Sequence, residues 1–189
     1  MTKRITLAAT VSVIVVLIAS GSDAQDSSRD RGFSPYVDAS GNIQFPSNFR
    51  DEMVHLGSWF VPEGDASGFH DVFTEKESAQ AFRKTGAFPD GATLVKELRA
   101  ADAGDYTTGQ NVSFPTDGLK QWFVMIKDSK GRFADNPIWG DGWGWALYKP
   151  DDPAKNVATN YKVDCLGCHI PAKETDWVFV EAYPTLGAN

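Results

Sequence analysis

The sequence predicts an α+β fold, mainly an antiparallel sheet of about five strands with a few helices packed against it. Three observations support this prediction. Segments of alternating apolar and polar residues recur after residue 92, turn sequences rich in glycine and proline separate them, and one segment before them has a helical pattern. Short connections between consecutive strands favour antiparallel neighbours.

The composition is that of a globular protein and argues against a nucleic-acid partner. The 189 residues include 18 Lys and Arg against 25 Asp and Glu, which gives a formal net charge of -7. Nucleic-acid partners select basic surfaces, so no nucleic acid is expected to bind. Six tryptophans and an aromatic content of 12% indicate a core or a pocket built from rings.

The N-terminal segment predicts export. Basic residues precede an apolar run at residues 5–21, which ends in a small-residue exit. These are the parts of a secretory signal peptide, which we place at residues 1–24, followed by a polar leader at 25–32 and one domain at 33–189. An uncleaved anchor is the alternative, but a spanning helix needs about 20 strongly apolar residues and hydroxyl side chains interrupt this run. We therefore expect a periplasmic protein with no stable membrane insertion after cleavage.

Residues 75–84 form the clearest predicted helix, with Thr74 as its N-cap and Gly86 just past its end. A turn is predicted at residues 88–91, because proline presets one backbone dihedral and glycine accepts a positive one. The strand candidates that follow are residues 92–100, 109–114, 119–127 and 143–149. Turn sequences at 115–118 and 128–131 are expected to separate the middle strands from their neighbours.

The strongest chemical signal is the motif Cys165-Leu166-Gly167-Cys168-His169. Covalent c-type haem attachment needs thiols spaced to meet the two vinyl groups of one porphyrin. The histidine directly after the second thiol then lies under the iron as an axial ligand. We therefore predict one haem c held by Cys165 and Cys168, with His169 as the ligand of the iron.

Other uses of these cysteines remain open. A disulfide at this spacing would close a tiny loop and so constrain little of the unfolded chain. A thioredoxin-type redox pair normally opens a helix near the start of a βαβ unit, whereas this motif comes late in the chain. A zinc site would need His55 and His70 to complete its four ligands.

The second axial position of the iron is predicted to be open. No methionine or histidine follows His169, so Met53 and Met125 are the thioether candidates of the mature chain. Met125 lies in an apolar run, residues 122–126, that is explained more simply as a buried strand. A five-coordinate iron with an open distal face binds or transforms small molecules, whereas a plain electron carrier would use a sixth ligand such as Met125.

Lys96 is the unusual member of a predicted strand face. Strand alternation places it between Leu94 and Leu98, while Val95 and Glu97 take the opposite face. Burying an ammonium is costly, so the lysine either lies at a sheet edge with its amine in water or is held largely neutral. A neutral amine can act as a nucleophile toward an electrophilic cofactor, and in this protein the oxidised porphyrin edge is such an electrophile.

These residues together resemble the cytochrome P-460 and cytochrome c′-beta family. The resemblance covers residues 45–186. The segments that carry it are residues 84–91, 93–98, 165–169, 176–179 and 183–184. It implies an exported, β-rich, mono-haem c protein with an open distal site, usually a homodimer.

The resemblance also implies a choice between two activities. In the P-460 branch a lysine is bonded to a porphyrin meso carbon, and the enzyme oxidises hydroxylamine to nitric oxide or nitrous oxide. In the c′-beta branch that bond is missing, and the protein binds nitric oxide or carries electrons. Lys96 lies where the crosslinking lysine of the P-460 branch belongs, so we expect the first activity. Electrons would then pass to an external acceptor, such as a soluble cytochrome.

One departure from the P-460 branch concerns the proton acceptor. The resemblance implies a distal carboxylate a few residues before the haem motif, yet residues 156–163 contain none, and Asp164 adjoins Cys165. His70 belongs to a segment that the resemblance brings toward the distal face, so it is a candidate for distal proton transfer. A surface or capped histidine is the alternative for His70, and His55 is expected to be structural.

Residues 139–148 alternate aromatic rings with glycines. Glycine lets a flat group approach the backbone closely, so these rings could line a haem wall. Ordinary cross-strand aromatic packing explains the same pattern.

Overall fold

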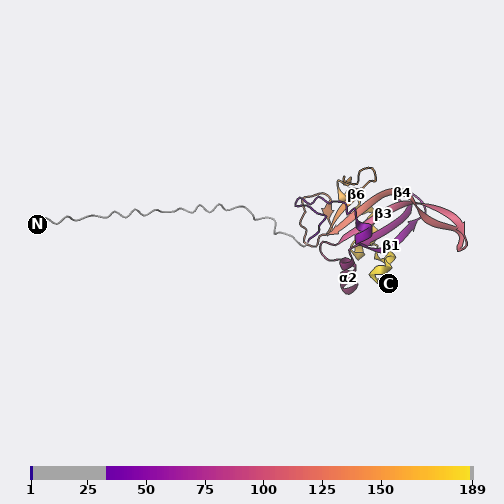
Figure 1. The fold of residues 1–189 in the computed structure, drawn as a ribbon, viewed down its shortest axis with the longest axis horizontal. Coiled ribbons are helices and arrows are strands. Elements are labelled where there is room, and N and C mark those ends of the chain that lie inside the picture. The colour runs from indigo at the N-terminus through magenta and orange to yellow at the C-terminus, as the bar shows by residue number, and fades with distance from the viewer. Residues whose placement is uncertain (2–32, 188–189) are drawn as a thin grey trace. The chain divides into compact units, whose positions relative to one another are not determined.

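Six strands form one antiparallel sheet in the spatial order β1-β2-β3-β4-β6-β5 (Figure 1). The computed structural model describes Met1 and residues 33–187, so the predicted signal peptide and polar leader lie outside the described residues. The strands are β1 (Val54–Val61), β2 (Gly68–Thr74), β3 (Thr93–Tyr106), β4 (Gly109–Lys127), β5 (Trp139–Gly140) and β6 (Trp143–Tyr148). The predicted fold class, an antiparallel sheet with few helices, is confirmed.

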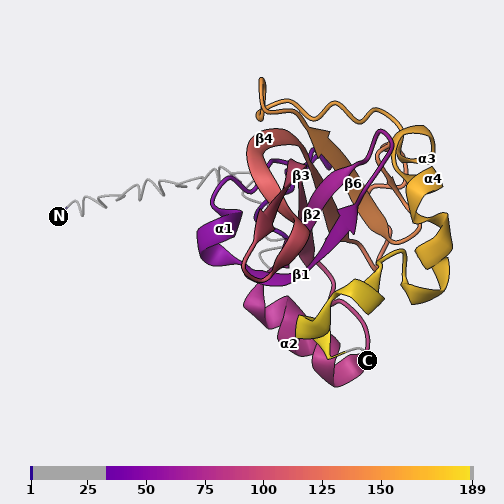
Figure 2. The same cartoon turned by 90° about the vertical axis from the view of Figure 1, so that its right-hand side faces the viewer.

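The helices are short and lie around the sheet, with α1 on one side of it in Figure 2, α2 below it, and α3 and α4 on the other side. The α-helices are α1 (Phe49–Glu52), α2 (Lys76–Thr85), α3 (Tyr161–Asp164) and α4 (Leu166–His169), and the 3₁₀ turns are η1 (Ile170–Thr175), η2 (Val180–Ala182) and η3 (Pro184–Leu186). The helices that the structure describes include none with the length and apolar character that a membrane crossing requires.

The helix predicted at residues 75–84 is present one residue later, as α2. Gly86 ends it in the left-handed conformation, with φ 75°, as expected. The N-cap prediction was wrong, because Glu75 and not Thr74 holds that position. Thr74 is still part of β2, where its hydroxyl donates to the carbonyl of Thr93 at 2.7 Å.

The strand predictions need two corrections. Residues 115–118 do not form a turn between two strands but lie within β4, which runs unbroken along β3. β4 has more residues than β3 at this point, and the additional residues form a bulge. There the hydroxyl of Thr116 donates to the carbonyl of Ala100. Pro115 has no backbone N–H, so it leaves no donor unpaired. The other correction is that β1, β2 and the two-residue β5 were not predicted. β2 is buried along most of its length, so the alternation that marks a half-exposed strand is absent.

The sheet carries a core on each face. One face of the sheet also lines the cavity described in the next subsection, so the core on that face is called the cavity-side core. It includes Leu56, Val72, Leu94, Met125, Trp143 and Trp145. The opposite core includes Phe33, Phe49, Met53, Val95, Val124 and Tyr148. α2 and the segment after residue 176 cover the cavity-side core, whereas residues 33–53 cover the opposite core. The predicted division of β3 is therefore correct, with Leu94 on one face and Val95 on the other.

The glycines between the tryptophans accommodate rings of the chain itself. A Cβ at Gly144 would lie 2.6 Å from the indole of Trp139, and one at Gly140 would lie 2.3 Å from the phenol of Tyr161. Alternation along β6 sends Trp143 and Trp145 to the cavity-side core and Tyr148 to the opposite core. Cross-strand aromatic packing thus explains most of the 139–148 pattern, and Trp145 alone among its tryptophans lines the cavity described below.

Glu97 anchors the opposite face of β3. Its carboxylate is almost fully buried and accepts hydrogen bonds from Arg50, from Arg99 and, at 3.1 Å, from the indole N–H of Trp122. These donors come from α1, from β3 itself and from β4. One buried anion therefore ties the N-terminal cover to the two central strands.

Replacing Glu97 with alanine is expected to lower the free energy of unfolding by about 3 kcal/mol. This is the lower end for breaking a buried ion pair, because Arg50 remains half exposed. Urea unfolding measures the change, with Asp102→Ala on the exposed part of the β3–β4 hairpin as the control. Equal losses in the two variants would contradict the anchoring role.

The pKa of Glu97 predicts how the stability of the fold changes at acid pH. Burial alone would raise the pKa of Glu97, but the hydrogen bonds from Arg99, Arg50 and Trp122 outweigh it and hold that pKa below its ordinary value. The stabilisation is therefore complete above the unfolded-state pKa of about 4.3 and is lost as the pH falls through the folded-state pKa. Wild type should lose stability over this window more steeply than Glu97→Gln.

Candidate functional site

A cavity of about 280 Å³ lies between the sheet and the C-terminal part of the described chain. The sheet contributes Leu94, Lys96, Leu98, Phe123, Met125 and Trp145, and β2 adds His70 and Val72. The opposite wall is made by Cys165, Cys168, His169, Val178, Phe179 and Tyr183. Five predicted site residues, far apart in sequence, thus meet at one mainly apolar cavity: His70, Lys96, Cys165, Cys168 and His169.

The haem motif begins directly after the short helix α3, and its last four residues form the helical turn α4. The side chain of Asn160 caps α3 by accepting from the backbone N–H of Lys162 at 3.0 Å. Cys165 lies between α3 and α4 and is partly buried, whereas Cys168 is exposed, and neither is in a disulfide. Both thiols border the cavity, as attachment to one macrocycle requires.

His169 is oriented for binding a metal through one nitrogen. Its Nδ1 donates to the backbone carbonyl of Trp177 at 2.7 Å, which leaves the Nε2 lone pair available. The ring packs edge-on against Trp145, with the centroids 4.9 Å apart. Burial lowers the pKa of His169 to about 4, against the raising effect of the Trp177 carbonyl, so the imidazole is neutral at pH 7. A neutral, oriented imidazole fits the axial ligand of a haem iron.

Lys96 extends from the middle of β3 into the cavity. Its Nζ lies 4.1 Å from the centroid of the Phe123 ring, and it forms no ion pair with any described residue. Burial lowers the pKa of Lys96 to about 8, partly offset by the negative charge that Cys168 and Cys165 can carry. The edge-strand interpretation is wrong, because β3 lies between β2 and β4 and the amine faces the cavity.

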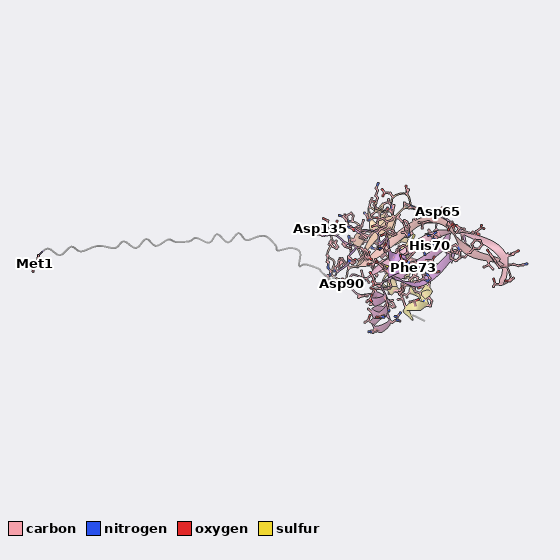
Figure 3. The ribbon with its side chains drawn as sticks, in the orientation of Figure 1. Met1, Asp65, His70, Phe73, Asp90 and Asp135 are labelled. Carbon is pink, nitrogen blue, oxygen red and sulfur yellow. The ribbon has the colours of Figure 1, made fainter. Side chains whose placement is uncertain are left out.

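His70, which is labelled in Figure 3, belongs to β2. It is buried and lines the cavity. Its Nε2 donates to the carbonyl of Ala66 at 2.7 Å, which leaves Nδ1 as an acceptor. Burial lowers the pKa of His70, so the ring is mainly neutral near pH 7. The surface interpretation of His70 is therefore wrong.

His55 lies apart from the cavity. Its side chain is half exposed, with Nε2 3.3 Å from a carboxylate oxygen of Asp71 and 3.2 Å from the hydroxyl of Ser58. It is therefore not placed with the cysteines as a zinc site would need. Among residues 33–187, no group of three or more His, Cys, Asp and Glu side chains is arranged to hold a metal ion.

The carboxylate of Asp164 is committed to its own loop. It accepts from the backbone N–H groups of Thr159 at 2.7 Å and Asn160 at 2.9 Å. The hydrogen bonds from Asn160 and Thr159 lower the pKa of Asp164. Although this residue borders the cavity, its charge stabilises the turn that leads into the haem motif.

The two methionines lie on different faces of the sheet. Met53 belongs to the opposite core and is excluded as an iron ligand by its position. Met125 is a buried residue of β4, as predicted, but strand alternation directs it to the cavity.

Several cavity residues were not predicted as site residues, including Trp59, Phe123, Phe179 and Tyr183, whereas Trp145 belongs to the 139–148 segment that was a candidate for a haem wall. Alternation along the strand predicted at 143–149 could have placed Trp145 on one face with Trp143. The side chains after residue 177 follow 3₁₀ turns without a period, so no sequence pattern predicts their direction. Tyr183 is buried there, and burial raises the pKa of its phenol.

A larger depression of about 430 Å³ is formed by residues 128–143 and 160–162. It contains none of the predicted site residues, and its most buried carboxylate, Asp128, is already bonded to Arg132 at 2.7 Å. The predicted site residues therefore lie at the smaller cavity and not in this depression.

Comparison with known proteins gives one family match. The cytochrome P460 family model matches residues 46–180, which include the strands, the cysteines and His169. No curated protein matches the chain.

The lowered pKa of Lys96 can be tested by titration. In haem-free protein, one lysine should titrate near pH 8, and its side-chain NMR signal should disappear in Lys96→Met. Because the unfolded-state pKa is about 10.4, the unfolded chain binds more protons over this interval, so stability should rise between about pH 8 and 10.4. Lys96→Met should remove this rise and Lys162→Met should keep it. Titration of every lysine near 10.4 would show that Lys96 is solvated.

Proposed function

The chain belongs to the cytochrome P460 family, and we propose that it is a periplasmic mono-haem c-type cytochrome that oxidises hydroxylamine to nitric oxide or nitrous oxide. One observation carries this proposal: Lys96 enters from β3 the same cavity that Cys165, Cys168 and His169 border. Thiols and an imidazole alone support haem binding, whereas the lysine supports modification of the porphyrin.

The residues present fit a covalently held haem. The cavity is mainly apolar, the thiols lie at its border, and His169 offers Nε2 while Trp177 fixes the other nitrogen. When bound, the haem supplies an iron that takes up electrons from a coordinated nitrogen compound. Cys165 and Cys168 would hold the macrocycle by thioether bonds, and His169 would be the residue that binds the iron.

Lys96 is proposed to form a third covalent link to the porphyrin. Joining Nζ to a meso carbon replaces one N–H and one C–H bond by a C–N bond, so a peroxide-class oxidant must accept both hydrogens with their electrons. The lowered pKa of Lys96 supports this role, because only the neutral amine is a nucleophile. The direct substitution and the resulting distortion both alter the electronics of the iron.

His70 is proposed to accept protons during turnover. Hydroxylamine becomes nitric oxide by losing all its hydrogens as protons, with one electron for each. Nδ1 of His70 is a neutral acceptor at the cavity, whereas the carboxylate of Asp164 is occupied by its loop. The electrons go to an external acceptor, for which we propose a soluble cytochrome, and we expect the protein to act as a homodimer.

A second function is favoured by the occupied carboxylate of Asp164. A protein without a distal carboxylate could bind or detoxify nitric oxide, as in the c′-beta branch, without oxidising hydroxylamine. The visible spectrum of the reduced protein separates the possibilities. A strongly red-shifted Soret band indicates the crosslink, an ordinary high-spin spectrum the c′-beta type, and a low-spin spectrum a carrier in which Met125 binds the iron.

Haem attachment is expected to need both thiols. Cys165→Ala/Cys168→Ala should lose covalent haem, which intact mass spectrometry and pyridine haemochrome spectra report. His169→Ala should keep the covalent haem with altered ligation, because the thioether bonds do not depend on the imidazole. A normal covalent haem in the double variant would refute the proposal.

Lys96→Arg is expected to keep both thioether bonds and to lose the red-shifted Soret band. Hydroxylamine oxidation should fall by about 100-fold, the upper range for groups that tune a metal centre. Arginine keeps the positive charge but is not a usable nucleophile. Lys162→Arg, at an exposed lysine beside the motif, is the matched control. Peptide mapping that finds Lys96 free in fully matured wild type would favour the c′-beta function instead.

A further inference from the structure

The turn that follows η1 has an unusual backbone. Asp176 has φ 56° and ψ 39°, and Trp177 has φ 66°, so consecutive non-glycine residues occupy the left-handed region. A side chain with a Cβ disfavours this region, and for a bulky residue such as tryptophan it is an outlier. Asn111 and Asp141 are the other non-glycine examples among the described residues, and neither is followed by a second non-glycine residue of positive φ, since Asp141 precedes Gly142.

This turn determines where the carbonyl of Trp177 points. The backbone N–H of Trp177 donates to the carbonyl of Ala172 at 2.8 Å, while its own carbonyl accepts from Nδ1 of His169 at 2.7 Å. The hydroxyl of Thr175 closes the turn by donating to the carbonyl of Val178 at 2.7 Å. The acceptor of the imidazole hydrogen bond is therefore held by a backbone shape that the residues do not prefer.

Two side chains of the sheet hold Asp176 in this shape. Nζ of Lys127, at the end of β4, lies 2.7 Å from one carboxylate oxygen of Asp176 and 2.8 Å from the other. The indole N–H of Trp143, which is fully buried in β6, donates to the backbone carbonyl of Asp176 at 3.0 Å. Lys127 is itself only 12% exposed and lies over the Trp143 ring. These contacts of Lys127 and Trp143 with Asp176, which we call the clamp, connect β4 and β6 to the turn.

We infer that Asp176 is a positioning residue for the axial histidine, acting through the Trp177 carbonyl; this rests on the proposed function of His169 as the iron ligand. A carbonyl held firmly against Nδ1–H gives the imidazole more anionic character and makes Nε2 a stronger donor to the iron. Stronger donation favours the oxidised iron and lowers its reduction potential. The Lys127–Asp176 pair therefore tunes the iron from two hydrogen bonds away.

The test uses the mature haem protein and three variants. Asp176→Ala removes the ion pair and disfavours the left-handed backbone, whereas Asp176→Asn tolerates that backbone and keeps an acceptor for Lys127. Asp141→Ala is the matched control, because Asp141 also has a positive φ, 53°, but its carboxylate accepts from the hydroxyl of Tyr161. Resonance Raman spectra of the ferrous protein give the iron–histidine stretching frequency, and redox titration gives the midpoint potential.

Asp176→Ala should lower the iron–histidine frequency and shift the reduction equilibrium about tenfold toward the ferrous form, which is about 59 mV for one electron. Asp176→Asn and Asp141→Ala should stay close to wild type. Should Asp176→Ala fail to accumulate, Asp176→Gly carries the same test, because glycine accepts the left-handed backbone and lacks the carboxylate that Lys127 contacts.

An unchanged frequency and potential in Asp176→Ala, with only a lower melting temperature, would overturn the positioning role and leave a structural ion pair. An equal shift in Asp141→Ala would also overturn it. Absence of covalent haem in wild type would overturn the proposed function itself, and the inference with it, so the failures are distinguishable.

Discussion

The alternation of side chains along β3 is the constraint on which the rest of the structure depends. Because successive residues point to opposite faces, Lys96 enters the cavity only if Glu97 enters the opposite core. A slip of one residue would exchange them, placing a carboxylate in the cavity and an ammonium among buried rings. The hydrogen bonds that Glu97 accepts from α1, β3 and β4 prevent that slip. The register that places Lys96 in the cavity is thus determined by hydrogen bonds on the opposite face of the sheet.

Much of the site was predictable because its chemistry requires particular residues at particular spacings. The cysteine motif restricts the cofactor, and the period of a strand places Lys96 between leucines. What the sequence could not predict depends on tertiary contacts. The carbonyl of Trp177 has no side-chain signature, and the direction of the Asp164 carboxylate depends on N–H groups exposed by a loop. The burial of His70 could not be predicted either, because His70 lies in β2, whose sequence does not alternate as a half-exposed strand does.

The fold showed the same division between local and non-local information. Gly86 ends α2 as predicted, since a left-handed residue after a helix is a local requirement. Pro115 and the glycine that follows it predicted a turn, yet β3 supplies a long partner and the segment becomes a bulge within β4. Thr74 likewise has the side chain of an N-cap, but the neighbouring strand engages its hydroxyl first. In the cases of Pro115 and Thr74, contacts with β3 overrode a local preference.

The order of elements along the chain has a consequence for how the protein matures. All six strands of the described chain precede the cysteine motif, so a chain that is synthesised from its N-terminus can pair its sheet before either cysteine has been added. Lys96 and its apolar neighbours would then already form one wall of a groove. The segment from α3 to η3, which carries both cysteines, adds the other wall last. The position of the two cysteines in the polypeptide thus makes the wall that carries them the last part of the cavity to form.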